Sequence, residues 1–177
     1  MSGKGGPRLL ATRVTHLEMT VPAVMRVPTP SGLRLALMRA TNMPLPFYRF
    51  MYEQVGKAHH WAMRRNVDDD ALAEVIHAEA TQIHLLYADG SPAGFFELDL
   101  SDEQCADIVY FGLVPHFQGR GLARFLLSEA IAAAWANDPA RVTIETNTLD
   151  NPRALQIYQK MGFLPVAWRE EVIEAWD

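Results

Sequence analysis

The amino-acid sequence predicts a mixed α/β domain in which helices pack on one sheet. Runs of alternating apolar and polar residues, the pattern of half-buried strands, recur between clear turn signals. Residues 119–135 are mostly apolar over a length typical of a helix buried against a sheet. Strands and helices are expected in the order strand, helices, three strands, helix, strand, helix, strand. This interleaving favours a mixed sheet over separate helical and strand domains.

The first half of the chain supplies two strands and several short helices. An extra strand is expected over 15–21 and a second over 33–42. Helices are predicted over 47–55, 59–65 and 71–76. The run Asp68, Asp69, Asp70 stands immediately before the last of these helices, and we interpret it as helix capping, because carboxylates there bind free helix amides.

The second half continues with a three-strand meander. The predicted strands cover 82–87, 93–100 and 106–114, and Asp89-Gly90 between the first two is a strong hairpin signal. The remaining elements are the helix over 119–135, a strand over 142–146, a helix over 151–161 with Asn151 as N-cap and Pro152 at its first position, and a strand over 163–172.

Length and composition limit the classes of function. With 177 residues, we expect one domain over 32–177, preceded by an N-terminal extension over 1–31 that includes the extra strand. The longest apolar run, 130–136, is too short to span a bilayer, and 1–13 has no signal-peptide core. The net charge of −5 argues against nucleic-acid binding. Cys105, the only cysteine, allows no internal disulfide and favours a reducing cytoplasm.

The loop between the strand 106–114 and the following helix carries the main functional signal. Gly119, Gly121 and the small Ala123 leave the amides at the start of the helix accessible, and Arg120 adds a positive charge. These features are typical of a pyrophosphate cradle, although a purely structural turn would use the same glycines. The third small position of the dinucleotide-binding fingerprint is absent.

Two longer motifs favour the ligand-binding interpretation. Gln118-x-x-Gly121-x-Ala123 resembles the Gln/Arg-x-x-Gly-x-Gly/Ala signature of the GNAT superfamily of N-acetyltransferases. Downstream, the segment 151–163 is similar to the superfamily's Asn-x-x-Ala-x-x-x-Tyr-x-x-x-Gly-Phe pattern. The diagnostic residues fall within 107–163, and the first thirty residues have no counterpart. The resemblance implies a mostly antiparallel sheet with two splayed strands and flanking helices.

The resemblance also implies acetyl-CoA as co-substrate and assigns residues to it. The main-chain N–H of Phe111 would face the acetyl carbonyl and that of Leu113 the pantetheine amide. Gly112, on the same strand, allows a bulge or a close backbone approach, unless it is a plain kink. The residues expected to bind the coenzyme are Phe111, Leu113, Val114, Gln118, Gly119, Arg120, Gly121, Leu122, Ala123 and Asn151.

Acetyl transfer to an amine also needs an acid and a base. By resemblance, Tyr158 protonates the departing thiolate, since a phenol stays protonated at neutral pH; without the motif it would be interpreted as a core tyrosine. The base is less well defined: we single out Asp107 and Glu97, with Asp99, Glu145 or a chain of waters as alternatives.

The acceptor is expected to be a primary amine of a small molecule or of an amino acid or peptide. His59, His60 and Trp61 are candidates for its pocket, and we expect no metal site, because adjacent histidines on a helix point in different directions. A coenzyme A-binding module without turnover is the alternative function. No nucleic acid or membrane is expected as a partner, and homodimer formation stays open.

Overall fold

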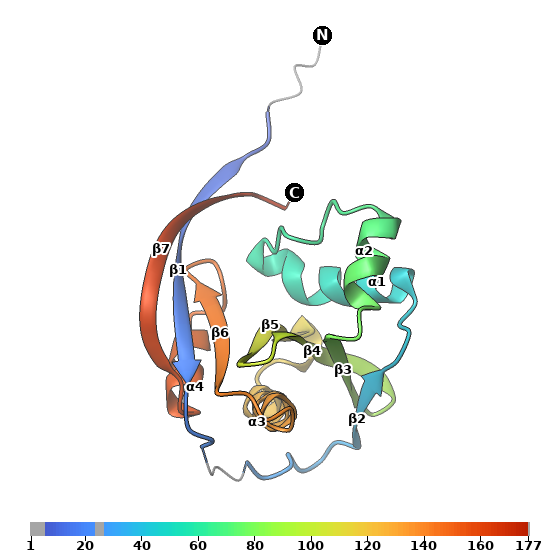
Figure 1. Cartoon of the computed structure of the whole chain (residues 1–177). Coiled ribbons are helices and arrows are strands. Elements are labelled where there is room, and N and C mark those ends of the chain that lie inside the picture. The colour runs from blue at the N-terminus through green and yellow to red at the C-terminus, as the bar shows by residue number, and fades with distance from the viewer. Residues whose placement is uncertain (1–5, 24–26, 177) are drawn as a thin grey trace.

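In a computed structural model, which describes residues 6–23 and 27–176, the chain forms a seven-stranded sheet with the order β2-β3-β4-β5-β6-β1-β7 (Figure 1). The strands are β1 (Leu9–Met19), β2 (Leu35–Ala40), β3 (Thr81–Ala88), β4 (Ser91–Asp102), β5 (Cys105–Leu113), β6 (Arg141–Asn147) and β7 (Leu164–Glu174). Neighbouring strands are antiparallel except β5 and β6, which are parallel. The mixed, mostly antiparallel sheet is therefore confirmed.

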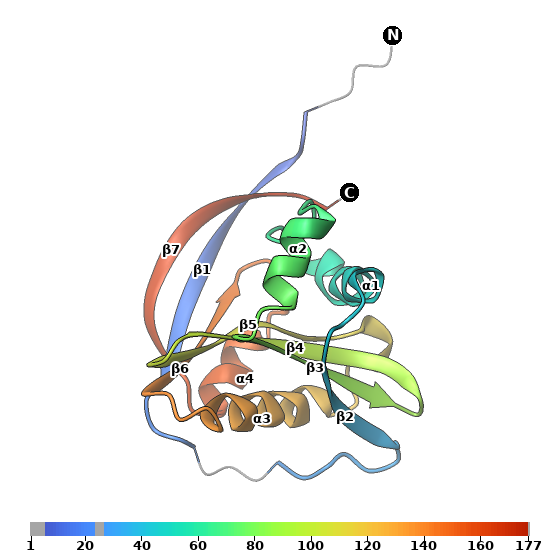
Figure 2. The same cartoon turned by 45° about the vertical axis from the view of Figure 1, so that its right-hand side comes forward.

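Helices cover both faces of this sheet (Figures 1 and 2). On one face, α1 (Leu45–Gly56) and α2 (Asp69–Ile76) pack on β3, β4 and β5 through a core that includes Met51, Leu72 and Phe95. On the other face, α3 (Leu122–Trp135) and α4 (Ala154–Lys160) pack through a second core that includes Leu126 and Ile108. Two single 3₁₀ turns, η1 (Lys57–His59) and η2 (Pro115–Phe117), complete the elements of the described residues.

Two local predictions are confirmed in atomic detail. Asp89 and Gly90 form the two-residue turn between β3 and β4, with φ of 50° and 85°, the left-handed conformation that Asp-Gly tolerates. At the start of α2, the Asp68 carboxylate accepts a hydrogen bond from the Ala71 N–H at 2.9 Å. The run of aspartates therefore caps the helix.

The predicted helix over 59–65 is wrong. Only the turn η1 forms, and His60 ends it in the left-handed conformation with φ of 57°. The chain then turns toward the sheet, where Arg64 contacts buried Glu97 on β4 at 2.7 Å. This buried ion pair anchors the segment in an irregular path.

Element boundaries differ at both motif helices and at the first strand. The helix predicted from 119 starts at Leu122, because Gly119 and Gly121 have positive φ values of 73° and 78°. The helix predicted from Asn151 starts at Ala154, and a turn precedes it. The extra strand expected over 15–21 spans Leu9–Met19 and pairs with β6 on one side and β7 on the other. It is thus an inner strand of the sheet.

None of the helices among the described residues is long and apolar enough to cross a membrane.

Candidate active site

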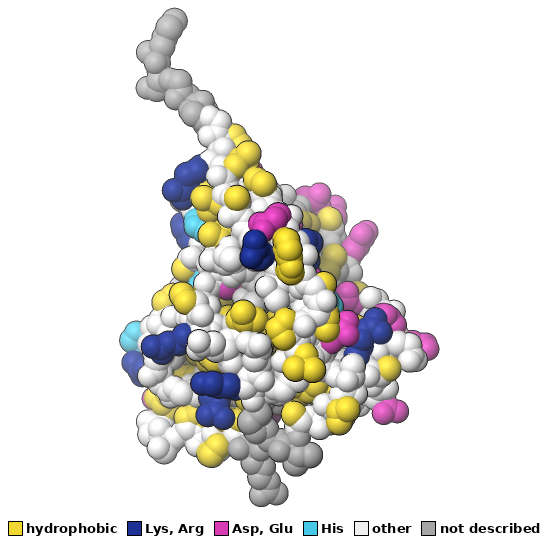
Figure 3. All heavy atoms as spheres, turned by 90° about the vertical axis from the view of Figure 1, so that its left-hand side faces the viewer, with side chains coloured by type: hydrophobic (Ala, Val, Ile, Leu, Met, Phe, Trp, Pro, Cys, Tyr) yellow, Lys and Arg dark blue, Asp and Glu magenta, His cyan; other side chains and the backbone are white. Residues whose placement is uncertain are grey.

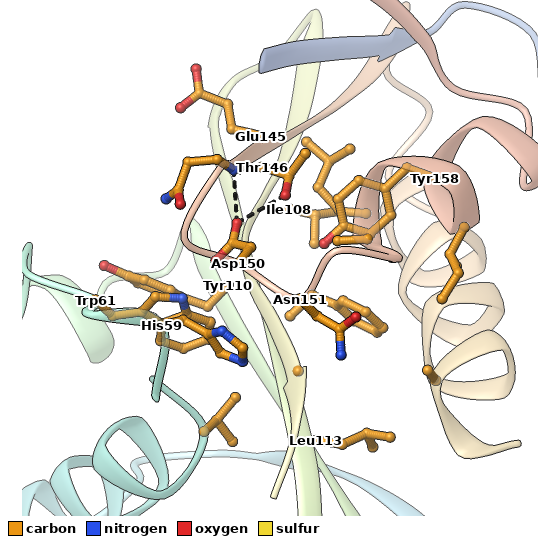
Figure 4. A pocket seen from close by; sticks show the side chains of 18 of the residues that line it. His59, Trp61, Ile108, Tyr110, Leu113, Glu145, Thr146, Asp150, Asn151 and Tyr158 are labelled. Atoms are coloured by element: carbon orange, nitrogen blue, oxygen red, sulfur yellow. Dashed lines mark hydrogen bonds between the residues drawn. The ribbon is translucent and has the colours of Figure 1, made fainter. Parts of the chain in front are cut away.

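A cavity of about 440 Å³ opens where β5 and β6 separate. These strands pair only between 105–108 on β5 and 141–144 on β6, and they diverge beyond this point (Figure 1). Residues from β5, the loop before α3, the β6–α4 loop, α4, β7 and the 59–63 segment line the cavity. Figure 4 shows His59 and Trp61 on one side of it, and Asn151 and Tyr158 on the other.

A bulge in β5 places side chains on both sides of the cavity. Leu98 pairs with Ile108, but its neighbour Glu97 pairs with Tyr110, so Val109 is an extra residue. As a result, Ile108 belongs to the core beneath α3, whereas Tyr110 belongs to the core beneath α1. The sequence allows a bulge at Gly112, but the bulge lies three residues earlier, at Val109.

Gly112 instead permits a close approach between β5 and α1. A Cβ atom at this position would collide with the Val55 side chain of α1. Gly56, at the end of α1, is similarly restricted, because its Cβ would lie 2.5 Å from the Trp61 ring. These two glycines let α1 and the Trp61 ring lie directly against the cavity-lining strand.

The backbone of β5 presents hydrogen-bond donors to the gap between β5 and β6. The Val114 N–H donates to the Ala93 carbonyl of β4 at 2.8 Å. Because successive amides of a strand point in opposite directions, those of Gly112 and Tyr110 also point toward β4. The amides of Leu113 and Phe111 therefore point toward the gap, in the direction that their predicted roles require.

The loop before α3 surrounds the entrance of the cavity. Gln118, Gly119, Gly121 and Ala123 line it, and α3 has no side-chain cap, so its first amides have no acceptor from that source. The Gln118 side chain donates its Nε2–H to the Leu113 carbonyl at 3.4 Å, which ties the loop to the end of β5.

The other three predicted coenzyme-binding residues of this region are not among the cavity-lining residues. The Arg120 guanidinium lies 5.7 Å from the centroid of the Phe117 ring. Leu122 is fully buried in the core beneath α3, and Val114 packs against both cores. Leu122 can still contribute through its main-chain amide, since it is the first residue of the helix.

Tyr158 and Asn151 both line the cavity, as their spacing predicted. Tyr158 is buried, and its ring packs edge-on to that of Phe111 with centroids 6.1 Å apart. Burial, together with the charge of Asp150, raises the pKa of Tyr158 well above the usual value of 10. Asn151 does not cap α4; its Oδ1 accepts from the Arg153 N–H at 3.0 Å in the preceding turn.

Asp150 is a cavity residue that the sequence reasoning missed. Its Oδ2 accepts hydrogen bonds from the Thr146 hydroxyl and the Asn147 N–H, both at 2.9 Å (Figure 4). The carboxylate therefore shapes the β6–α4 loop just before Asn151. Its position directly before the motif asparagine, in the loop after the predicted strand over 142–146, is the signal that the sequence offers.

The two predicted bases lie outside the set of cavity-lining residues. Glu97 is 1% exposed and is held by the Tyr48 hydroxyl and Arg64, both at 2.7 Å; burial raises its pKa. Asp107 accepts a hydrogen bond from the Thr143 hydroxyl at 2.6 Å, and burial raises its pKa as well. The structure does not bring either carboxylate to Tyr158.

Aromatic and charged side chains lie at the end of the cavity away from α3 (Figure 4). The Trp61 ring packs on Tyr110 with centroids 4.8 Å apart. Arg169 of β7 forms a two-pronged ion pair with Glu145 of β6, at 2.7 and 3.0 Å. This contact lowers the pKa of Glu145, and Glu171 lies 3.7 Å from the same guanidinium.

Comparison with known proteins shows which family this chain resembles. The family profile described as "Acetyltransferase (GNAT) family" matches residues 43–163. A mycothiol acetyltransferase from Beutenbergia cavernae is 26% identical over 148 residues, which cover 82% of this chain and 50% of that protein. The chain thus spans half the length of that relative.

Solved structures share the fold. A GCN5-related N-acetyltransferase from Sphaerobacter thermophilus aligns with a TM-score of 0.64 at 18% identity, over 96% of this chain and 54% of that one. A spermidine N-acetyltransferase from Vibrio cholerae, in complex with CoA and spermine, aligns with a TM-score of 0.61 at 20% identity, over 75% and 82% of the two chains.

Proposed function

Because the chain belongs to the acetyltransferase (GNAT) family, we propose that it transfers the acetyl group of acetyl-CoA to a primary amine of a small molecule. One observation carries the proposal. One cavity brings together three features: the main-chain donors of β5 that point away from β4, the accessible amides at the start of α3, and the protonated Tyr158.

The α3 end of the cavity suits the donor. The amides between Gly119 and Ala123 carry the partial positive charge of a helix N-terminus and have no side chain in front of them at Gly119 and Gly121. A pyrophosphate fits such a cradle. The outward amides of Phe111 and Leu113 would then pair with the polar groups of the extended pantetheine arm, and Asn151 lies on the opposite side.

The residues in the middle of the cavity suit the chemical step. The amine nitrogen forms a bond to the thioester carbon, and the Phe111 N–H stabilises the negative charge that develops on the carbonyl oxygen, by about 3 kcal/mol. As the C–S bond breaks, Tyr158 donates its phenolic proton to the departing sulfur. The acceptor ammonium loses one proton to water or to one of the cavity carboxylates, Glu145, Asp150 and Glu171, before it attacks. The second proton, lost after the C–N bond has formed, passes through water and restores the Tyr158 phenol.

The opposite end suits a cationic acceptor. Glu145 and Glu171 together exceed the single charge of Arg169. An ammonium group entering here meets a net negative wall and the Trp61 ring. One relative is named a mycothiol acetyltransferase and one structural neighbour a spermidine N-acetyltransferase, which supports a small-molecule acceptor for this chain.

Calorimetric titration with acetyl-CoA, followed by measurement of thiol release across a panel of small amines, tests the proposal. We expect saturable binding and amine-dependent thiol release. Binding without release on any amine would instead support a non-catalytic coenzyme A module, and absence of binding would overturn both.

A further inference from the structure

The C-terminal end of the chain crosses from β7 to the segment that follows α1. Figures 1 and 2 show β7 curving along the edge of the sheet, so that its last residues approach the α1 and α2 region. We call residues 174–176 the C-terminal strap. The Trp176 N–H donates to Nδ1 of His60 at 2.9 Å, and Arg65 donates to the Ala175 carbonyl at 2.9 Å.

Further contacts hold the strap in place. Arg65 also pairs with the Glu174 carboxylate at 3.2 Å, and its guanidinium lies 5.4 Å from the centroid of the Trp176 ring. Ala175 is 4% exposed. A segment with this degree of burial and pairing is a built part of the fold.

The strap connects the two walls of the acceptor end of the cavity from outside, because none of its residues lines the cavity. One wall consists of residues 60–63, and the other of Arg169, Glu171 and Ile173 on β7. Antiparallel pairing connects β7 through β1 to β6, and the Trp61–Tyr110 contact connects the first wall to β5. Because His60 contacts Trp176, these contacts form a closed ring around the acceptor end.

His59 makes a second bridge in another direction. Its Nδ1 lies 3.3 Å from the Leu149 carbonyl of the β6–α4 loop. The two adjacent histidines thus contact different segments: His60 contacts the strap, and His59 contacts the β6–α4 loop.

We infer that the C-terminal strap, latched by His60 and Arg65, closes the acceptor end of the cavity and restricts transfer to compact amines. This inference rests on the proposed function and narrows its acceptor class. A volume of about 440 Å³ must hold both the acyl-bearing arm of the donor and the acceptor, and it lies at the lower end of ordinary ligand pockets. An amine attached to a polypeptide would have to pass beneath the strap.

Two variants open the strap without changing the donor side. One ends the chain after Glu174; the other is His60→Gly, which removes the latch but suits the left-handed φ of 57°. The substrates are the best small amine of the panel and the same amine coupled to a decapeptide. We expect the ratio of kcat/KM for the coupled amine to that for the free amine to rise at least tenfold in both variants, with acetyl-CoA affinity unchanged. An unchanged ratio, in folded variants that bind acetyl-CoA, would overturn the inference.

Trp168→Ala is the matched control, because Trp168 is an exposed tryptophan on β7 that does not line the cavity. It should leave the ratio unchanged. Hydrogen exchange tests the strap contact independently of the proposed function, because the measurement requires no turnover. The Trp176 amide should exchange at least tenfold faster in His60→Gly than in the parent and in Trp168→Ala. Equal rates would show that the latch does not exist in solution, whatever the amine panel shows.

Discussion

The two ends of the cavity are built in different ways. The donor end uses main-chain groups from one continuous part of the chain, β5 through α4, with glycines that keep the amides accessible. The acceptor end uses side chains from segments far apart in the sequence: Trp61 after α1, Glu145 on β6 and Arg169 on β7. A backbone site depends on local conformation, whereas a side-chain site depends on the packing of the whole sheet.

This difference separates main-chain groups, whose binding role does not depend on residue type, from side chains that substitution can change. Amides at a helix start and in a strand bind phosphates and carbonyls whatever the surrounding side chains are. The charged and aromatic residues of the acceptor end can change without disturbing those amides. We therefore expect substitutions at the donor end to abolish binding or chemistry, and substitutions at the acceptor end to change which amine is used.

The largest effect is expected for Gly121→Glu. A glutamate places bulk and negative charge in the cradle and strains a residue with φ of 78°, so acetyl-CoA affinity should fall at least a hundredfold in calorimetric titration. Gly32→Glu is the matched control: Gly32 has a comparable φ of 84°, has open space around its Cβ position and lies outside the cavity lining. If the two variants bind acetyl-CoA with equal affinity, this loop does not bind the pyrophosphate.

Tyr158→Phe should reduce kcat about a hundredfold and leave acetyl-CoA affinity nearly intact, because only the proton donor is lost. Tyr87→Phe, a tyrosine outside the cavity lining, serves as the control. The pH profile gives a second readout. Burial raises the pKa of Tyr158, so its acid form persists to higher pH than that of a free phenol, and deprotonation of Tyr158 should cause no loss of activity up to about pH 10. An unchanged kcat in Tyr158→Phe would show that another group protonates the departing sulfur.

The same contrast explains how far the sequence could predict the site. Gln118, Gly121, Asn151 and Tyr158 lie at fixed spacings within short motifs, and all four line the cavity. Their positions depend on local geometry, because the start of α3, the turn before α4 and the first turns of α4 set where they lie. The hairpin at Asp89-Gly90 was predictable for the same reason.

Contacts between distant segments could not be predicted from local patterns. The path of residues 57–65 depends on Arg64 meeting Glu97 beneath α1, a pairing that no helical or strand period encodes. The full length of β1 depends on partners on both sides, one of which follows it by about 150 residues. Glu97 was a reasonable candidate base by sequence, but its role in this ion pair only becomes visible in three dimensions.

Glu97→Gln tests whether that carboxylate belongs to the chemistry or to the fold. Breaking a buried ion pair should lower the free energy of unfolding by about 3 kcal/mol, measured by denaturant titration. Because Glu97 lies outside the cavity lining, we expect kcat to change less than fivefold with the best acceptor. Asp107→Asn should likewise leave kcat within fivefold. A hundredfold loss of kcat in either variant would restore that residue as the general base.

A small and graded loss of kcat is expected at Asp150, which acts through the β6–α4 loop. Asparagine keeps an acceptor oxygen for the Thr146 hydroxyl or the Asn147 N–H, so Asp150→Asn should lower kcat only about threefold. Alanine removes both hydrogen bonds and should lower kcat about tenfold, with the KM for acetyl-CoA rising as the loop and Asn151 shift. If Asp150→Asn is as impaired as Asp150→Ala, the charge itself is required, which would place Asp150 beside the amine as a base. If both variants are as active as the parent, this loop needs no anchor.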